Sequence, residues 1–383
     1  MRDKLADLIR PGSRVALGDG YGAPRSASAA LSAAAARAGG VRLVLGWVPA
    51  HDPDLDLSAF ADVRAVMGGW GLRKDIDSGA VHYVPTRLGT IPALIHGPLR
   101  PDVLVTSLVR VPGGYAWGSE VSWMRAAVDA GAVIAGVLRS ALPHADAGAP
   151  LPEDRVVIVD ESAEPPLFMP PMRDSPAHAD LGRRAATVIP EGARVQVGPG
   201  PLGAALLASL QAPVRIDSGM LPEAIVDLDR RGLLIGEPMA TYLTGSSTLF
   251  AWADGRPILQ PIEVTHDPGR LSNDTPLIAI NTALEIDDDG QVNVEGTASS
   301  NVGGIGGHPD FAAAGTRSIG GLSIVATPTQ HQGRSTKVRQ LARPVSTPAH
   351  DVDIVVTERG TVDLRGLDRP ERRAALASLW GER

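Results

Sequence analysis

The sequence predicts two tandem open α/β domains. A chain of 383 residues is long enough to divide between two cores. Short apolar runs alternate with alanine-rich runs in each half, a pattern typical of parallel sheets covered by helices. Between the halves, four prolines fall within residues 165–171, which suits an extended crossing segment. We expect an N-terminal domain over residues 1–170 and a C-terminal domain over residues 171–383.

The first half shows the alternation most clearly. Residues 26–38 are rich in alanine and predict a helix. Because strands and helices alternate, the strands should form a largely parallel sheet, which binds ligands at the carboxyl ends of its strands. The expected strands are residues 13–18, 41–45, 103–107 and 133–137.

The second half begins in the same way. Residues 194–198 predict a strand, residues 202–210 a helix and residues 214–217 the next strand. Each half therefore opens with a strand, a glycine turn and an alanine-rich helix. This likeness is one of layout and not a sequence repeat.

Composition excludes several classes of function. Hydrophobic residues make up 44% of the chain, charged residues 21%, and the formal charge is −7, so neither a nucleic-acid surface nor a membrane surface is expected. The chain has no cysteine, which excludes disulfides, thiolate metal sites and a cysteine nucleophile. Neither an apolar leader near the start nor an apolar run of about 18 residues is present, so we expect a cytoplasmic protein.

Glycine-rich motifs in the last third carry a family resemblance. Residues 303–311 read Gly-Gly-Ile-Gly-Gly-His-Pro-Asp-Phe, and residues 318–326 and 353–360 follow with Ser-Ile-Gly-Gly-Leu-Ser-Ile-Val-Ala and Asp-Ile-Val-Val-Thr-Glu-Arg-Gly. Together they resemble the C-terminal domain of the acetyl-CoA hydrolase/transferase family, which includes 4-hydroxybutyrate and acetate CoA-transferases. Weaker landmarks at residues 18–24, 82–85, 91–92 and 112–118 extend the resemblance over nearly the whole chain.

The resemblance implies two α/β domains of the CoA-transferase type that hold a short-chain acyl-CoA. Coenzyme A would be a substrate and not a permanently bound cofactor, a carboxylate would be the other substrate, and the chain would form a homo-oligomer. Asn281, in a segment similar to the family's Asn-Ser-Ala-Leu-Glu motif, would lie near the acyl group. The main-chain amides of the glycine loop would stabilise the thioester oxygen, because donors aimed at developing charge accelerate acyl transfer. The implied oxyanion and CoA-binding residues are Gly304, Gly306, Gly307 and His308.

The chain departs from the family at the nucleophile. The family's catalytic glutamate, which forms acyl and CoA intermediates, matches Gly219 in Asp-Ser-Gly-Met at residues 217–220. Glu223, four residues later, is the nearest carboxylate that a helical turn could present, and it is our catalytic candidate beside Asn281. The substrate loop is expected at Gly198, Gly200 and Gly219. Without the glutamate, direct hydrolysis becomes more plausible than double displacement.

Two other functions stay open. The chain could be a catalytically inactive homologue that binds acyl-CoA. Alternatively, residues 198–203 match Gly-x-Gly-x-x-Gly after a strand, with Asp217 ending the next strand, as in dinucleotide-dependent oxidoreductases. Pro199 and Pro201 weaken that reading, because each removes an amide donor from the turn.

Other catalytic arrangements lack support. The nine histidines show no metal-binding spacing, so no metal site is expected. No Gly-x-Ser-x-Gly elbow marks a hydrolase serine. His308 is the one histidine inside the expected site loop, where it could bond the substrate or transfer a proton.

Overall fold

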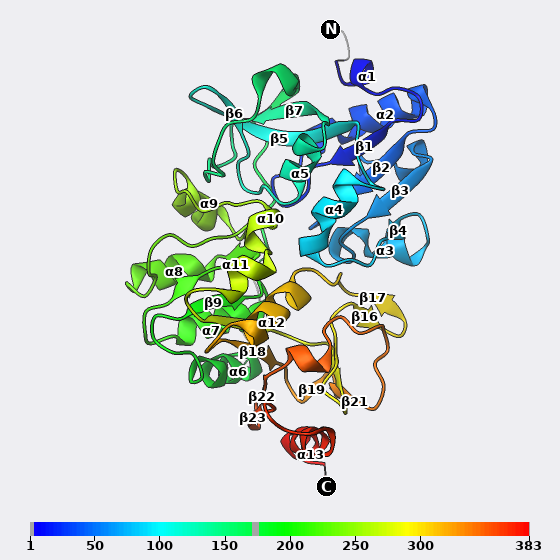
Figure 1. Ribbon diagram of the computed structural model, residues 1–383. Helices are drawn as coiled ribbons and strands as arrows, with labels where there is room; N and C mark the ends of the chain where they lie inside the picture. Colours follow the sequence, from blue (N-terminus) through cyan, green and yellow to red (C-terminus); the bar gives the residue numbers. More distant parts are fainter. Residues whose placement is uncertain (1–3, 171–175, 383) are drawn as a thin grey trace.

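The computed structural model describes residues 4–170 and 176–382. Two sheets, each from one half of the chain, lie in two adjoining bodies, with the blue and cyan half above the green to red half (Figure 1). The predicted boundary at residues 170 and 171 borders residues 171–175, which lie outside the described residues. The α/β fold with two sheets agrees with the expected fold class.

The N-terminal sheet is parallel apart from one short strand. Its order is β4-β3-β2-β1-β5-β7-β8, with β6 paired antiparallel to β5. The predicted strands and the helix at 26–38 are all present, with ends shifted by a few residues. The strands are β1 Arg14–Leu17, β2 Arg42–Leu45, β3 Asp62–Ala65, β4 His82–Tyr83, β5 Val103–Val111, β6 Gly114–Ala116, β7 Val133–Arg139 and β8 Val156–Ser162. The helices are α1 Lys4–Leu8, α2 Ser28–Ala38, α3 Arg73–Asp77, α4 Ile91–His96 and α5 Met124–Asp129.

The C-terminal sheet has the order β10-β9-β13-β18-β22-β23, parallel except for the final hairpin. Strands β9 and β10 and helix α7 lie where the sequence predicted them. The strands are β9 Arg194–Val197, β10 Arg215–Ile216, β13 Leu277–Asn281, β18 Leu322–Ala326, β22 Ile354–Thr357 and β23 Gly360–Asp363. The helices are α6 Pro176–Ala186, α7 Pro201–Ser209, α8 Ala224–Arg230, α9 Ser247–Ala253, α10 Ile262–Thr265, α11 Pro268–Ser272, α12 His308–Arg317 and α13 Arg369–Trp380.

Short strand pairs connect these elements. The pair β11 with β12 is parallel and lies next to the N-terminal domain, because Tyr242 of β12 forms a bridge with Glu120. The others are small sheets around the glycine-rich segment and the C-terminal helix. Their bounds are β11 Met220–Pro222, β12 Tyr242–Thr244, β14 Glu285–Asp287, β15 Val292–Asn293, β16 Gly296–Thr297, β17 Ser300–Asn301, β19 Gln330–His331, β20 Arg334–Ser335 and β21 Lys337–Val338.

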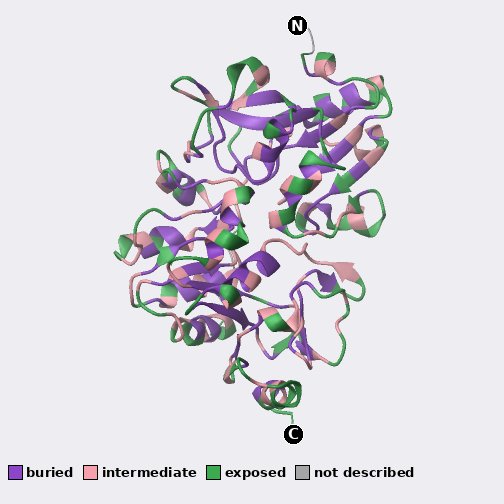
Figure 2. Ribbon diagram, in the orientation of Figure 1, coloured by how far each residue is buried: buried purple, intermediate pink, exposed green. Residues whose placement is uncertain are grey.

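Burial explains why the sequence forms these layers. The central strands of both sheets are buried along their length, whereas the outer faces of the helices are exposed (Figure 2). Buried strands covered on both faces read as continuous apolar runs, as in Val-Leu-Val at 103–105 and Leu-Ile-Ala-Ile at 277–280. One hydrophobic cluster includes residues of both halves, so the two bodies pack through a shared core.

Candidate functional site

The side chain of His266 lies between Gly219 and Gly307. A Cβ added at Gly219 would lie 3.2 Å from Nε2 of His266, and a Cβ added at Gly307 would lie 2.4 Å from the same atom. Such an approach at Gly307 would be a clash, so the histidine ring and a side chain there cannot coexist without movement. The ring of Phe311 packs against His266, with a centroid distance of 4.8 Å. The structure therefore joins the two glycines through one imidazole.

The surroundings of His266 fix its ring and its charge. Nδ1 lies 2.8 Å from the hydroxyl oxygen of Thr265, and that hydroxyl lies 3.4 Å from the carbonyl oxygen of Pro261. A chain in which Nδ1–H donates to Thr265 and Thr265 donates to Pro261 satisfies both groups and leaves Nε2 unprotonated. Nε2 is buried and has no hydrogen-bond partner in the described chain. Burial, with a smaller effect of Arg270, lowers the pKa of His266 to about 3, so the ring is neutral.

Arg270 ties the His266 segment to the Gly219 segment. Its guanidinium donates to both carboxylate oxygens of Asp217, at 2.6 and 2.9 Å, just before Gly219. It also donates to the carbonyl oxygens of Val264 and Thr265, at 2.7 and 3.2 Å. Because Arg270 occupies both oxygens of Asp217, that carboxylate is not available to a ribose hydroxyl, which argues against the dinucleotide interpretation.

The glycine segment 303–307 is held against the N-terminal domain. Gly303 forms an antiparallel bridge with Gly69, and the carbonyl oxygen of Gly306 accepts from the amide of Leu88 at 3.0 Å. The Ile305 amide donates to the Tyr83 hydroxyl at 3.2 Å. A donor that already has a partner cannot serve as an open oxyanion donor, so not every amide of this loop is available. The segment is a contact between domains as well as a candidate binding loop.

The start of α12 carries two buried ionisable groups. Asp310 accepts from the Gly89 amide at 2.9 Å and lies 3.6 Å from Nε of Arg87, and burial raises its pKa to about 6. His308 is also buried, and neither ring nitrogen has a hydrogen-bond partner among the described residues. Burial lowers the pKa of His308 to about 4, so it is neutral near pH 7.

The other predicted site residues have different surroundings. The carboxylate of Glu223 accepts from the amide and the hydroxyl of Ser246, at 2.5 and 2.7 Å, at the start of α9. The side chain of Asn281 forms two amide hydrogen bonds with Gln196, at 3.0 and 3.2 Å. Both groups are thus held by protein partners.

The glycines of the predicted substrate loop differ from one another. A Cβ at Gly198 or Gly200 would meet nothing within 4 Å, whereas Gly219 faces His266. Gly304 is packed closely, because its Cβ would lie 2.8 Å from the amide nitrogen of Gly68. Of the residues predicted from the sequence, Gly219 and Gly307 are the two that the structure brings to one side chain.

A second buried cluster joins the domains at the end of β1. One carboxylate oxygen of Asp19 accepts from the Trp47 amide, the Trp123 indole and the Tyr242 hydroxyl, at 3.0, 3.0 and 2.7 Å. Burial raises the pKa of Asp19. Glu120 lies nearby and is fully buried, and burial together with the charge of Asp19 raises its pKa to about 8. With its pKa raised to about 8, the carboxyl of Glu120 is mostly protonated near pH 7 and adds no second negative charge beside Asp19.

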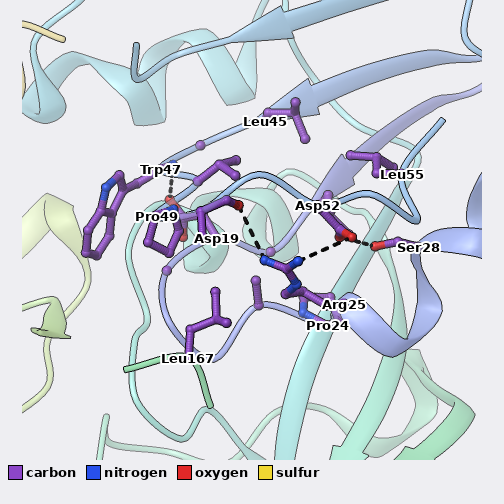
Figure 3. A pocket seen from close by; sticks show the side chains of 17 residues that line it. Asp19, Pro24, Arg25, Ser28, Leu45, Trp47, Pro49, Asp52, Leu55 and Leu167 are labelled. Atoms are coloured by element: carbon purple, nitrogen blue, oxygen red, sulfur yellow. Dashed lines mark hydrogen bonds and ion pairs between the residues drawn. The ribbon is translucent and has the colours of Figure 1, made fainter. Parts of the chain in front are cut away.

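A narrow pocket opens beside this cluster, at the carboxyl ends of β1 and β2 (Figure 3). The view shows Arg25 with its guanidinium beside Asp52, whose carboxylate also accepts from the Ser28 hydroxyl at 2.7 Å. Most of the remaining lining is apolar and includes Trp47 and Leu167. Arg25 is the one cation among the described residues that line the pocket, and it is already paired with Asp52, so these residues offer no unpaired positive charge to a phosphate.

Sequence reasoning missed His266, Glu120 and Tyr242. The local signal at His266 was only that of a helix start, because Asp267 and Pro268 form a typical N-cap and first helical position. Nothing in the spacing linked residue 266 to Gly219 or to Gly307. The burial of three charged or titratable side chains in separate segments is a tertiary property that local patterns do not report.

In residues 4–170 and 176–382, no three histidine, aspartate or glutamate side chains are grouped so that they could hold a metal ion. No helix in these residues is both long and apolar enough to cross a membrane.

Comparison with known proteins adds an independent observation. Residues 245–379 match the family described as the acetyl-CoA hydrolase/transferase C-terminal domain. A 4-hydroxybutyrate coenzyme A transferase of Clostridium kluyveri is 23% identical over 335 residues, which cover 82% of this chain and 78% of that protein.

Two solved structures share the fold. RipA from Yersinia pestis superposes with a TM-score of 0.88 at 23% identity and covers 98% of this chain and 92% of that one. A 4-hydroxybutyrate CoA-transferase from Porphyromonas gingivalis gives a TM-score of 0.78 at 21% identity, with the same coverage. At these identities the likeness establishes the fold alone.

Proposed function

Because the chain belongs to the acetyl-CoA hydrolase/transferase family, we propose that it is an enzyme that cleaves the thioester of a short-chain acyl-CoA without a glutamyl-CoA intermediate. Coenzyme A is a substrate in this proposal, and the acyl acceptor is water or a small carboxylate. The supporting observation is the meeting of Gly219 and Gly307 at one buried imidazole. Gly219, the position that matches the family nucleophile, has no side chain, and the imidazole of His266 lies where that side chain would project.

The segment that resembles the family's thioester loop fits this function. Gly307 and His308 end the loop at the start of α12, and neither amide donates to another group among the described residues. Free amides next to a reacting carbonyl can stabilise an oxyanion, worth about 3 kcal/mol for each donor. The neighbouring Ile305 amide is bound to Tyr83 and fixes the loop instead.

A direct assay tests the proposal. The purified protein is incubated with acetyl-, propionyl-, butyryl- and succinyl-CoA, alone and with acetate or succinate, and free thiol is followed with a thiol reagent. Because the chain has no cysteine, it contributes no thiol to the signal. We expect CoA release in the absence of a carboxylate, and formation of a new acyl-CoA would show transfer. Neither CoA release nor exchange with any of these substrates would contradict the proposal.

A second candidate is a binding protein without turnover. The missing carboxylate at Gly219 favours it, since two intermediates of the family reaction are acyl derivatives of that group. Calorimetry with acyl-CoA distinguishes the two candidates, because binding with no product supports the second. Restoring a glutamate also requires room, since a Cβ at Gly219 would lie 3.2 Å from the His266 ring. The informative variant is therefore Gly219→Glu combined with His266→Ala, compared with each single change.

A further inference from the structure

The imidazole of His266 is the one buried base that faces both glycines of the candidate site. Nε2 has no hydrogen-bond partner among the described residues, and a Cβ placed on Gly219 or on Gly307 would lie 3.2 or 2.4 Å from it. A buried polar atom without a hydrogen-bond partner lowers the stability of the fold by about 1–3 kcal/mol. When a protein keeps such an atom, a functional role is one explanation for it. Because Nε2 lies next to the loop that is expected to bind the thioester, the group that it could meet belongs to the reacting acyl-CoA.

We propose that His266 is the general base of this enzyme and that its Nε2 atom activates water for attack on the acyl-CoA thioester. The inference rests on the proposed function and adds a catalytic residue and a reaction class, hydrolysis, to it. The geometry supports the role because the ring stands where a side chain of residue 219 would project. The position of the ring also explains the two glycines. Any larger residue at position 307 would collide with the ring, and a Cβ at position 219 would lie only 3.2 Å from Nε2.

The proposed step is balanced in atoms and protons. Nε2 accepts a proton from water as the water oxygen attacks the carbonyl carbon of the thioester. The carbon–sulfur bond then breaks, and the protonated Nε2 returns its proton to the leaving CoA sulfur. The products are a carboxylic acid and coenzyme A, and the ring returns to its neutral form.

Thr265 and Arg270 position this base. The Thr265 hydroxyl, 2.8 Å from Nδ1, keeps the single N–H proton of the neutral ring on Nδ1, which leaves the lone pair on Nε2. Arg270 holds the carbonyls of Val264 and Thr265 and thereby fixes the backbone just before the histidine. Burial keeps the resting imidazole neutral, and the role of base rests on the position of Nε2.

Substrate must reach an atom that is covered in this conformation. Gly219 and Gly307 lie beside Nε2, and the ring of Phe311 packs against the imidazole. Gly307 belongs to the segment that bridges to Gly69 and Tyr83 of the N-terminal domain. A shift of this segment relative to the ring would open Nε2 without a change in the position of the base itself.

The test compares the steady-state kinetics of wild type and H266N on the acyl-CoA that the wild type hydrolyses fastest. We expect kcat to fall by about 100-fold or more, with KM changed by less than about threefold, as for loss of a general base. T265A should lower kcat by about tenfold and T265S should restore most of it, because only the hydroxyl is needed to hold the tautomer. His96→Gln, an exposed histidine at the end of α4, is the matched control and should keep the wild-type rate.

Separate outcomes identify which statement fails. Wild-type turnover that persists at an unchanged rate in H266N would overturn the role of His266 and leave the proposed function intact. Absence of wild-type turnover would overturn both. If H266N does not fold, as judged by circular dichroism, H266Q replaces it, and mass spectrometry of acid-quenched wild type decides independently. A covalent acyl group or CoA on a carboxylate would contradict general-base hydrolysis, whereas unmodified protein during turnover supports it.

Discussion

Arg270 donates to both oxygens of the Asp217 carboxylate and, through two further hydrogen bonds, to the backbone just before His266. One side chain thus joins the end of β10 to the end of α10. A bidentate guanidinium pair is both strong and directional, so it fixes relative position as well as charge. This relationship explains how Gly219 and His266, which are 47 residues apart in the sequence, keep their relative positions.

Replacing Arg270 by alanine should therefore weaken both fold and activity. The buried Asp217 would lose its bidentate partner and retain only Arg194 at 3.5 Å, so we expect a loss of about 3 kcal/mol in the free energy of unfolding. Urea denaturation measures this. R365A, which removes an exposed pair with Asp363, is the control and should cost less than about 1 kcal/mol. Equal losses in the two variants would contradict the clamp.

The hydroxyl of Tyr242 should contribute to the joining of the two domains. It is buried, donates to Asp19 at 2.7 Å, and belongs to the strand that bridges to Glu120. Tyr242→Phe removes this donor from a carboxylate that cannot reach water, so stability should fall by about 1.5–3 kcal/mol. Y115F is the matched control, because the Tyr115 side chain is only partly buried and its hydroxyl bonds to no described residue. A melting temperature unchanged in Y242F would count against the predicted contribution.

A methyl group at position 307 should be poorly tolerated. Its Cβ would lie 2.4 Å from Nε2 of His266, which forces either the ring or the loop to move, and overpacking of this kind costs about 1–3 kcal/mol. We expect G307A to lower both the melting temperature and kcat. G360A is the control, because a Cβ there would lie at an ordinary 3.5 Å from Leu379. Wild-type activity in G307A would show that the observed contact is not maintained in solution.

The raised pKa of Glu120 predicts that the folded state loses stability at mildly alkaline pH. Burial and the nearby Asp19 raise its pKa from 4.5 to about 8, while Arg139 acts weakly in the opposite direction. Between these values the folded state holds a proton that the unfolded state lacks, so folding weakens as pH rises through this window. The slope is at most about 1.4 kcal/mol per pH unit. The unfolded histidines, with pKa values of about 6.5, are mostly neutral only above about pH 7.5, so the effect of Glu120 is read from the difference between the wild type and a variant that lacks this carboxyl.

The variant that isolates this effect is E120Q, which retains the shape of the protonated side chain. Measured at pH 6.5, 7, 7.5 and 8, the unfolding free energy of the wild type minus that of E120Q should decline as pH rises. Parallel lines for the two proteins would show that another group causes the pH dependence. E153Q, on an exposed glutamate of the same domain, should follow the wild type.

His308 predicts the opposite dependence in mild acid. Its pKa falls from 6.5 to about 4 through burial, so between these values the unfolded state binds the proton and stability falls as pH decreases. His308→Gln removes this titration and should reduce the difference in unfolding free energy between pH 6.5 and pH 4.5. Circular dichroism melts of both proteins over that range measure it. An unchanged acid dependence would place His308 in contact with solvent.

Much of the architecture was already present in local patterns. The segment 103–107, which opens with the apolar run Val-Leu-Val, was predicted as a strand and lies in β5. The alanine-rich run before residue 38 became α2, and the glycine of Asp289-Gly290 turns the chain with positive φ between β14 and β15. The glycine segment 303–307 also stood out, since its composition alone marked a close approach.

The site was less accessible to such reasoning. Glu223 was the first carboxylate after Gly219 in the sequence, yet the fold holds it at the start of α9 through Ser246. His266 lies in a segment that locally signals only a helix start, and its contacts are 47 residues upstream and 41 residues downstream. Glu223 is therefore the closer of the two to Gly219 in the sequence, whereas His266 is the side chain that faces Gly219 in the fold.

The sequence by itself determined the α/β class, the order of most elements and the absence of a side chain at position 219, because these follow from residue type and local periodicity. Only the tertiary structure decided which group fills the space beside Gly219, which amides of the glycine segment are already bonded, and that Asp19, Glu120 and Tyr242 share one buried cluster. The physical reason is that burial and charge pairing depend on which segments meet, and no local pattern encodes the meeting of Gly219, His266 and Gly307.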